Sequence, residues 1–257
     1  MSGCGFTYRH YRETLRAASA SRAFVSFDRA RADAAPERFV VLRHDVDYAL
    51  EDARPLARLE AELGVAATYM VRPHSHYNPF GSPGFGILRE IVGLGHALGV
   101  HYDRSFYTAH AVPPAETLRR EVERLAAAFD TPVRVVAEHQ PGRSALPPPD
   151  LTGFIDAYDP RFMRDVKYLS DSCQFWREGC FCGVVDAASV PRLQVLVHPE
   201  WWSEAGTPAD VILDRWAARR GEEALADCRA EFRDFAGRGH LGNRHLFTRE
   251  NGGGGMG

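Results

Sequence analysis

Residues 40–65, VVLRHDVDYALEDARPLARLEAELGV, form the stretch that decides the fold. An apolar run ends at Asp45 and Asp47, and a helical pattern begins almost at once. Leucines and alanines recur at roughly helical spacing between Glu51 and Gly64, and a glycine is a natural helix stop. The stretch predicts a buried strand, a short connection with two carboxylates, and a helix.

The same alternation of short apolar runs and amphipathic helices continues along the chain. Further strands are predicted within residues 65–72, 96–103, 132–139, 153–159, 166–172 and 193–199, and further helices at 85–95, 113–130 and, as two segments, within 207–238. This order predicts one α/β domain over residues 1–240, a barrel whose strands all feed a single face. Residues 241–257 are expected to form a tail that is disordered at its glycine-rich end.

Composition and charge narrow the possible partners and location. The 257 residues are 45% hydrophobic and 25% charged, which is an ordinary globular composition with a substantial core. A formal net charge of -3 without a run of Lys and Arg argues against nucleic acid as a partner. We find no signal-peptide core and no apolar window long enough for a membrane helix, so we expect a cytoplasmic protein without membrane insertion. Oligomeric state is not predictable from these features.

The cysteines favour neither a disulfide framework nor a thiolate zinc site. Their number is odd and they show no paired C-x-x-C spacing, so reduced thiols are expected. A soft-metal site at Cys180 and Cys182 is the less favoured alternative to a buried, inert pair. The five residues are Cys4, Cys173, Cys180, Cys182 and Cys228.

Polar residues close several of the predicted strands, and in a (β/α) barrel the carboxyl ends of the strands build the active site. Aspartate and neutral imidazole bind divalent cations such as zinc or iron, and a further carboxylate or histidine can carry protons. The pattern therefore predicts metal-assisted hydrolysis. The residues at these positions are Asp45, Asp47, His101, Asp103, His139 and His198.

Structural roles are the alternatives for these and other polar residues. A strand-end aspartate often caps the next helix, which is the alternative for Asp45 and Asp47. His96 precedes its strand and should lie on the opposite face, so we expect it to be structural. His74 and His76 belong to a loop and either reach the mouth of the site or face solvent.

Four successive motifs resemble the polysaccharide deacetylase family, also called the NodB-homology or family-four carbohydrate esterases. They are Asp45 after VVL, GHALGVH ending in His101, the His-x-Pro of EHQPG, and LVHP at His198. A cytoplasmic branch of that family, often encoded with sugar-modifying enzymes, is more closely similar. That likeness rests on five motifs in order, RHDVD, YNPF, GHALGVHYD, YLSDS and HPEWW, and runs from about Tyr8 to Trp202. The resemblance implies a distorted (β/α) barrel, one divalent metal ion, and hydrolytic removal of an acetyl group from an amino sugar.

The resemblance also implies roles for the first motifs, with two departures. Asp45 takes the position of the catalytic base and Val46 that of a metal ligand, for which Asp47 is the substitute one residue later. His101 takes the position of the first histidine ligand. The family has a second histidine four residues further on, where this chain has Ser105.

Residues later in the chain complete the implied site. His139 stands where the family usually has an arginine near the base, and we assign it as the third ligand or as a partner of the base. His198 is the implied general acid, Asp171 its acidic partner, and Trp176 a wall of the pocket. The predicted ligand set is Asp47, His101 and His139, and the predicted catalytic set is Asp45, His198 and Asp171.

The cofactor and substrate follow from the same resemblance. We expect one divalent cation, zinc in the first place, with iron, cobalt and nickel as alternatives. The substrate is expected to be a small N-acetylated sugar or sugar-containing intermediate. Trp201 would stack on a sugar or pack under its loop. Residues predicted to contact the substrate are His76, Tyr77, Asn78, Asp103, Trp176 and Trp201.

Two other functions stay open at this point. His101, Asp103 and a distal His198 have the form of a two-histidine, one-carboxylate triad, as in non-haem iron oxygenases. Those oxygenases usually have all-β folds, which the repeated helical segments argue against. The missing second histidine also leaves open a deacetylase homologue that only binds a ligand.

Overall fold

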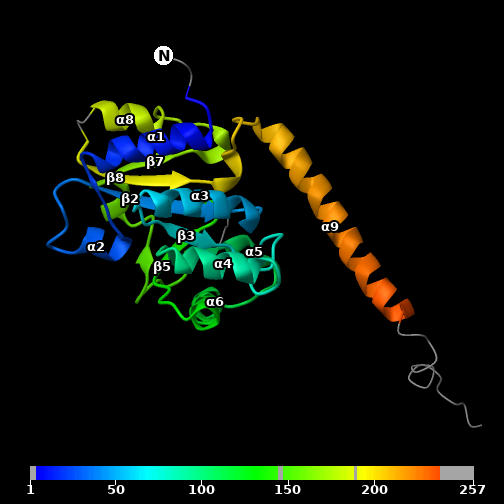
Figure 1. The fold of residues 1–257 in the computed structure, drawn as a ribbon. Helices are drawn as coiled ribbons and strands as arrows, with labels where there is room; N and C mark the ends of the chain where they lie inside the picture. The colour runs from blue at the N-terminus through cyan, green and yellow to red at the C-terminus, as the bar shows by residue number, and fades with distance from the viewer. Residues whose placement is uncertain (1–3, 144–146, 188–189, 238–257) are drawn as a thin grey trace, which may run out of the picture. The chain divides into compact units, whose positions relative to one another are not determined.

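The computed structural model describes residues 4–143, 147–187 and 190–237 (Figure 1). Strands and helices alternate through most of this range, as the sequence predicts. The elements are α1 (Tyr8–Ser19), β1 (Ala23–Phe24), α2 (Phe27–Arg31), β2 (Phe39–Val46), α3 (Leu50–Glu62), β3 (Thr68–Val71), α4 (Gly84–Gly93), β4 (Ala97–Tyr102), α5 (Arg104–Ala109), α6 (Pro114–Phe129), β5 (Val135–Glu138), β6 (Ile155–Asp156), α7 (Pro160–Met163), β7 (Lys167–Ser170), η1 (Ser172–Gln174), α8 (Phe181–Ala187), β8 (Arg192–Val197), η2 (Pro199–Trp201) and α9 (Ala209–Gly237).

The chain divides into two compact units, Met1–Ala209 and Asp210–Gly257. The first unit contains the sheet and every residue of the predicted site. The domain boundary at residue 240 and a disordered tail over 241–257 stay predictions, because residues 238–257 lie outside the described part of the chain.

Among the described residues the sheet has eight strands, and all their pairings are parallel. Its order is β6-β5-β4-β3-β2-β8-β7, with β1 paired to β2. Side chains from β2, β3, β5 and β6 nevertheless share one buried cluster, which strands so far apart in the order can do only if the sheet curls. Gln194 of β8 reaches across this interior and donates to the carbonyl of Ala157, which follows β6, at 3.1 Å. The predicted α/β fold with a distorted barrel is confirmed.

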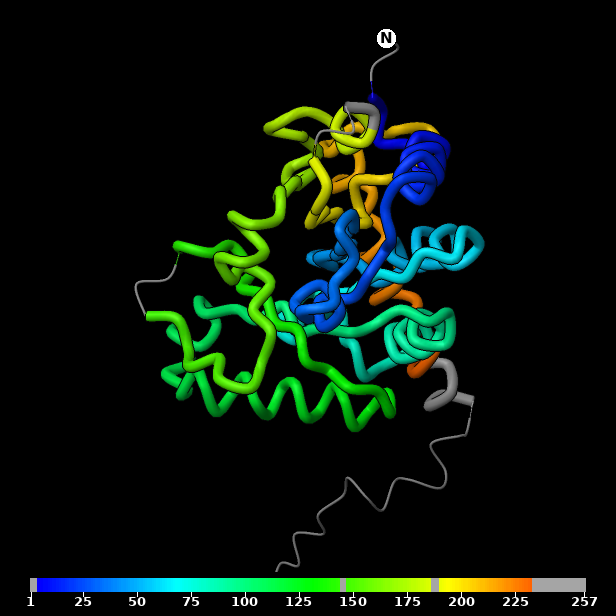
Figure 2. Tube along the Cα trace, turned by 90° about the vertical axis from the view of Figure 1, so that its left-hand side faces the viewer, coloured from blue at the N-terminus to red at the C-terminus, as the bar shows by residue number. Residues whose placement is uncertain are grey.

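Strand β2 shows how the interior positions its polar end. Side chains alternate along a strand, so Phe39, Val41, Arg43 and Asp45 share one face. Phe39 and Val41 lie in the interior cluster, so the same face carries Arg43 and Asp45 toward the open end of the barrel. The interior is tight: a Cβ at Gly99 would lie 2.9 Å from the backbone oxygen of Val135 and would also collide with the Met70 side chain, which favours glycine there. Figure 2 follows the chain around this interior.

The outer face of β2 carries a buried polar network against α3. Nε2 of His44 lies 2.7 Å from Oε1 of Glu60, and the hydroxyls of Tyr11 and Tyr69 donate to the same carboxylate at 2.5 and 2.8 Å. His96 lies in this layer, where its Nδ1 accepts from a backbone N–H and its Nε2 donates to a backbone carbonyl. It therefore lies on the helix side of the sheet, away from the strand ends.

Helix α9 corrects one prediction. Residues Ala209–Gly237 form one continuous helix, whereas we predicted two helical segments within 207–238. Gly221 lies inside it, but a single glycine costs a helix only about 1 kcal/mol relative to alanine and does not end it. Within the ranges that the structure describes, every helix is too short or too polar to cross a bilayer.

Candidate metal and catalytic site

Three side chains meet at the carboxyl ends of the parallel strands. Asp47 follows β2, His101 lies near the end of β4, and His139 follows β5. Oδ1 of Asp47 lies 3.4 Å from Nε2 of His101 and 3.8 Å from Nε2 of His139, and the three donor atoms all lie within 4.8 Å of one another. The structure thus brings the predicted ligand set together, while the role of these residues as ligands stays a prediction.

The state of Asp47 fits a cation. Its Oδ1 is buried, and within the described residues it has no hydrogen-bond partner of normal geometry. Burial disfavours the ionised form, but the nearby imidazoles of His101 and His198 lower the pKa of this carboxyl below its ordinary value. A buried anionic oxygen is costly unless a positive charge lies close to it. One carboxylate and two imidazoles are a suitable donor set for zinc or iron.

His101 presents the correct nitrogen to this position. Its Nδ1 lies 3.1 Å from the backbone carbonyl oxygen of Ala137 on the neighbouring strand β5. A carbonyl oxygen only accepts hydrogen bonds, so Nδ1 is the donor in this contact, and Nε2 is the nitrogen that would offer its lone pair to a bound cation. This is the usual arrangement of a metal-binding histidine, in which the second nitrogen fixes the ring.

His139 is oriented by Asp103. Nδ1 of His139 lies 3.5 Å from Oδ2 of Asp103, and Arg72 donates to the same oxygen at 2.7 Å. The other oxygen accepts from the backbone N–H groups of Ser105 and Phe106 at the start of α5. Burial opposes ionisation, but hydrogen bonds from His139 and Ser105 lower the pKa of Asp103. The contacts favour an orienting role for Asp103, and its predicted contact with substrate stays a prediction.

Asp45 is held by an arginine that we did not predict. Both oxygens of Asp45 accept from the Arg43 guanidinium, each at 2.7 Å, and both side chains are almost completely buried. Burial opposes ionisation of Asp45, but Arg43 and His101 lower its pKa below the ordinary value. Oδ2 of Asp45 lies 3.4 Å from Nε2 of His101, so an ionised carboxylate borders the three candidate ligands. The i, i+2 spacing on one strand face was the signal for this pair.

His198 and Asp171 form a second buried pair on the other side of the site. Nδ1 of His198 lies 2.7 Å from Oδ1 of Asp171, which also accepts from the His198 backbone N–H. The indole N–H of Trp202 donates to the other oxygen at 2.9 Å. Burial lowers the His198 pKa, but Asp171 outweighs it and raises the pKa to about 10. Nε2 of His198 faces the site, 4.0 Å from Oδ2 of Asp47.

Glu200 is a further acidic residue that the strand-end pattern did not select. It is buried, and neither carboxyl oxygen has a hydrogen-bond partner among the described residues. Burial and the negative charge of Asp47 raise its pKa well above the ordinary value of a glutamate. The shift shows that burial and the nearby Asp47 carboxylate both disfavour the ionised form of Glu200.

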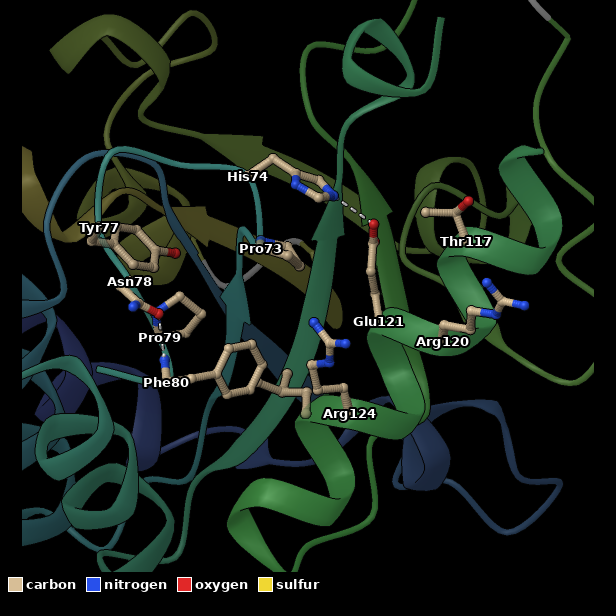
Figure 3. A pocket seen from close by; sticks show the side chains of 11 residues that line it. Pro73, His74, Tyr77, Asn78, Pro79, Phe80, Thr117, Arg120, Glu121 and Arg124 are labelled. Carbon is tan, nitrogen blue, oxygen red and sulfur yellow. Dashed lines mark hydrogen bonds and ion pairs between the residues drawn. The ribbon is translucent and has the colours of Figure 1, made fainter. Parts of the chain in front are cut away.

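The loop after β3 carries three of the predicted substrate contacts. Tyr77 is buried, and its hydroxyl donates to the carbonyl of Val46 at 2.9 Å, so it supports the strand end next to Asp47. Tyr77 and Asn78 also line a cavity of about 440 Å³ between this loop and α6, where His74 pairs with Glu121 (Figure 3). His76 is exposed. Contact of these residues with substrate stays a prediction.

The two predicted tryptophans differ in exposure. Trp176 is half-buried and lines a cavity of about 480 Å³ together with Tyr158 and Tyr168. The hydroxyl of Tyr158 lies 3.0 Å from Nη2 of Arg43, which connects this cavity with Asp45. Trp201 is only 6% exposed and has little surface to offer a sugar, so its position favours packing under the loop.

Comparisons with known proteins find similarity to a few solved structures, at low sequence identity. No protein-family model matches the chain, and no curated protein matches it. Two solved structures of a CE4 family pseudoenzyme from Bacillus anthracis, the wild type and a mutant with restored enzymatic activity, are similar at 15% and 14% identity with a TM-score of 0.40 each. Each similarity covers 71% of this chain, which spans 62% and 64% of the pseudoenzyme chains. The Streptococcus pyogenes deacetylase PplD in complex with acetate is similar at 12% identity and a TM-score of 0.41, over 76% of this chain and 83% of the deacetylase. A likeness of this size does not identify the chemistry of this chain.

Proposed function

We propose that this protein is a metal-dependent hydrolase that removes an N-acyl group, in the simplest case N-acetyl, from an amino sugar or a related small molecule. The observation that supports it most is the convergence of a candidate cation site, Asp47 with His101 and His139, between two proton-transfer candidates, Asp45 and His198. Amide hydrolysis needs a base that activates water, a positive charge near the carbonyl oxygen, and an acid that protonates the leaving amine.

Asp45 is the base in this proposal. Arg43 keeps it ionised, so the carboxylate is ready to accept a proton from the attacking water. When bound by Asp47, His101 and His139, a divalent cation supplies Lewis acidity that polarises the acyl carbonyl and makes a water molecule easier to deprotonate. Arg43 also fixes the orientation of the carboxylate, because it holds both of its oxygens.

His198 is the acid. Asp171 fixes its ring through Nδ1 and stabilises the imidazolium, which leaves Nε2 to give a proton to the amine as the C–N bond breaks. The products are a carboxylate and a free amine. Trp202 and the His198 backbone both donate to Asp171, so the acceptor that supports His198 is itself held in place.

An iron oxygenase that uses His101, Asp103 and His198 is less well supported. Asp103 is engaged by Arg72 and His139, and the described residues contain no group in which these three donors lie close enough for one ion. The set Asp47, His101 and His139 is itself one that binds iron(II). The identity of the metal is therefore part of the test.

The cavity that Tyr158 lines, which is linked to Asp45 through Arg43, favours a ring-containing substrate. Tyr158, Tyr168 and Trp176 give it aromatic walls, while Ser170 and Ser172 add hydroxyl groups. Pockets of this kind combine apolar faces with a few polar groups that fix orientation. An N-acetylated sugar presents both kinds of surface.

The test is acetate release from a panel of N-acetylated hexosamines and their nucleotide-linked forms. The purified full chain is treated with a chelator and reloaded with zinc, cobalt or iron(II). We expect release only in reloaded protein. Oxygen consumption without acetate release would favour the oxygenase, and sugar binding without turnover for every metal would favour a protein that only binds its ligand.

Asp171→Asn should lower turnover and move the alkaline limb of the pH profile to lower pH. Asp171 opposes the effect of burial and raises the pKa of His198 to about 10, so its loss lets burial lower that pKa. A general acid works only below its pKa, and the active range therefore shrinks from the alkaline side. The measurement is kcat against pH, with Asp165→Asn on the exposed surface as the matched control. An alkaline limb in Asp171→Asn identical to that of the control would contradict the pairing.

A further inference from the structure

A second group of metal-binding side chains lies outside the candidate catalytic site. It contains Cys4, His10, Cys180 and Cys182. Cys4 precedes α1, His10 lies in the first turns of α1, and the other two cysteines lie at the start of α8. Helices α1 and α8 lie side by side (Figure 1). The fold thus joins residues that are about 170 positions apart in the sequence, as His10 and Cys180 are.

The spacing of the donor atoms is close to that of a single zinc site. Sγ of Cys4 lies 3.4 Å from Sγ of Cys182, Nε2 of His10 lies 3.2 Å from Sγ of Cys180, and all four donors lie within 4.8 Å of one another. Bonds of about 2.3 Å to sulfur and 2.0 Å to nitrogen place the donors of a tetrahedral zinc site about 3.5–3.8 Å apart. Only small movements would give four bonds.

The backbone holds these residues in place independently of the thiols. Tyr8 donates to the carbonyl of Ser203 at 3.0 Å, and Ser203 donates to the carbonyl of Phe6 at 3.1 Å, so the backbone is fixed from the second residue after Cys4 onward. The Thr7 hydroxyl accepts from the backbone N–H of His10 and caps α1. The approach of the four side chains follows from this arrangement of the chain.

We propose that Cys4, His10, Cys180 and Cys182 hold a structural zinc ion. Three cysteines and one histidine form a closed set of four protein ligands, which is typical of structural rather than catalytic zinc. The ion would fasten the N-terminal segment to α8. This inference does not depend on the proposed hydrolase activity, because the two candidate sites share no residue.

The zinc would also support the wall behind the general acid. Phe6 packs against Trp202 with ring centroids 5.2 Å apart, and Trp202 donates to Asp171, the partner of His198. Phe6 also stacks on Trp176 at 6.4 Å. Fixing Cys4 two residues before Phe6 would limit the motion of this aromatic contact.

A disulfide between Cys4 and Cys182 is the competing use of these thiols. It would consume two of the cysteines, give His10 no role, and require an oxidant. The short distance between the sulfur atoms is therefore compatible with a zinc site or with a disulfide. The number of free thiols and the metal content distinguish the two.

Cobalt(II) is the probe, because thiolate ligands give it a charge-transfer absorption in the near ultraviolet that oxygen and nitrogen ligands do not give. The full chain, freed of metal by a chelator under a thiol-free reductant, is titrated with cobalt and then with zinc. We expect the thiolate band to appear, to disappear on zinc addition, and to survive in Asp47→Ala. It should be lost in Cys180→Ser and kept in Cys228→Ser, an exposed cysteine of α9. Zinc content should fall from about two ions per chain to about one in the Cys180 variant.

Cys4→Ala provides a second variant should Cys180→Ser fold poorly, since Cys4 is exposed near the chain end. It should also weaken or abolish the thiolate band while circular dichroism stays unchanged. Absence of the band in folded wild-type protein, or a Cys4–Cys182 disulfide that persists under reductant, would overturn the zinc site.

Discussion

His198→Ala should lower turnover by about 10²- to 10⁴-fold while the bound cation is retained, which is the usual contribution of a positioned proton donor. Nδ1 of His198 is taken by Asp171 at 2.7 Å, and its Nε2 faces Asp47 without belonging to the group of candidate ligands. The loss should be much smaller for an aryl acetate ester, because a phenolate leaves without being protonated. The measurement is kcat for the amide and the ester, with metal content determined on the same samples.

His110→Ala is the matched control, since it removes an exposed histidine that packs on Phe106 outside the site. It should change neither rate nor metal content. Loss of the cation together with activity in His198→Ala would make His198 a ligand and would contradict the acid role. An equal loss for amide and ester would also contradict it.

Asp47→Ala should abolish activity and weaken binding of the catalytic cation by more than about 100-fold. Substitutions of residues that only orient a ligand typically cost 10- to 100-fold in affinity, and Asp47 supplies one of three candidate donors itself. The fold should survive, because Asp47 lies after the end of β2 rather than in the interior cluster. Isothermal titration with zinc and thermal unfolding measure the two effects, and the thiolate band of cobalt reports separately on the cysteine cluster.

Asp103→Asn should weaken cation binding less than Asp47→Ala does. Asp103 orients His139 without belonging to the ligand group, so its loss should weaken binding by only about 10- to 100-fold. Wild-type affinity in Asp47→Ala, or a greater loss in Asp103→Asn than in Asp47→Ala, would show that the ligands are assigned wrongly.

The sequence predicts the convergence of the site residues because of a property of parallel sheets. Carboxyl ends of neighbouring parallel strands lie at the same edge, so polar residues that close β2, β4, β5 and β8 must come near one another. Asp47, His101 and His139 do so, and His198 borders them. The alternation of apolar runs and amphipathic helices also predicts the order of the elements, because hydrophobic periodicity is a property of each short segment.

Contacts between distant segments are not predictable in this way. The zinc ligands proposed in the N-terminal segment and at the start of α8 show no C-x-x-C spacing, and the packing of α1 on α8 brings Cys4 and His10 to Cys180 and Cys182. Glu200 looks like an ordinary polar residue of a loop, and its raised pKa arises from burial and from the charge of Asp47. Helix α9 is continuous because Gly221 costs too little free energy to end a helix. Counting the spacing of hydrophobic residues does not include this energy.

The most direct test is anomalous diffraction at the zinc edge from crystals of zinc-loaded protein. We expect an anomalous peak within zinc-ligand bonding distance of the donor atoms of Asp47, His101 and His139. Asp45 and His198 should lie outside that distance. A peak among the cysteines tests the structural zinc separately and does not affect this outcome. A fully loaded crystal with no peak at Asp47, or with a peak bonded to Asp103 and His198 instead, would contradict the proposed catalytic site.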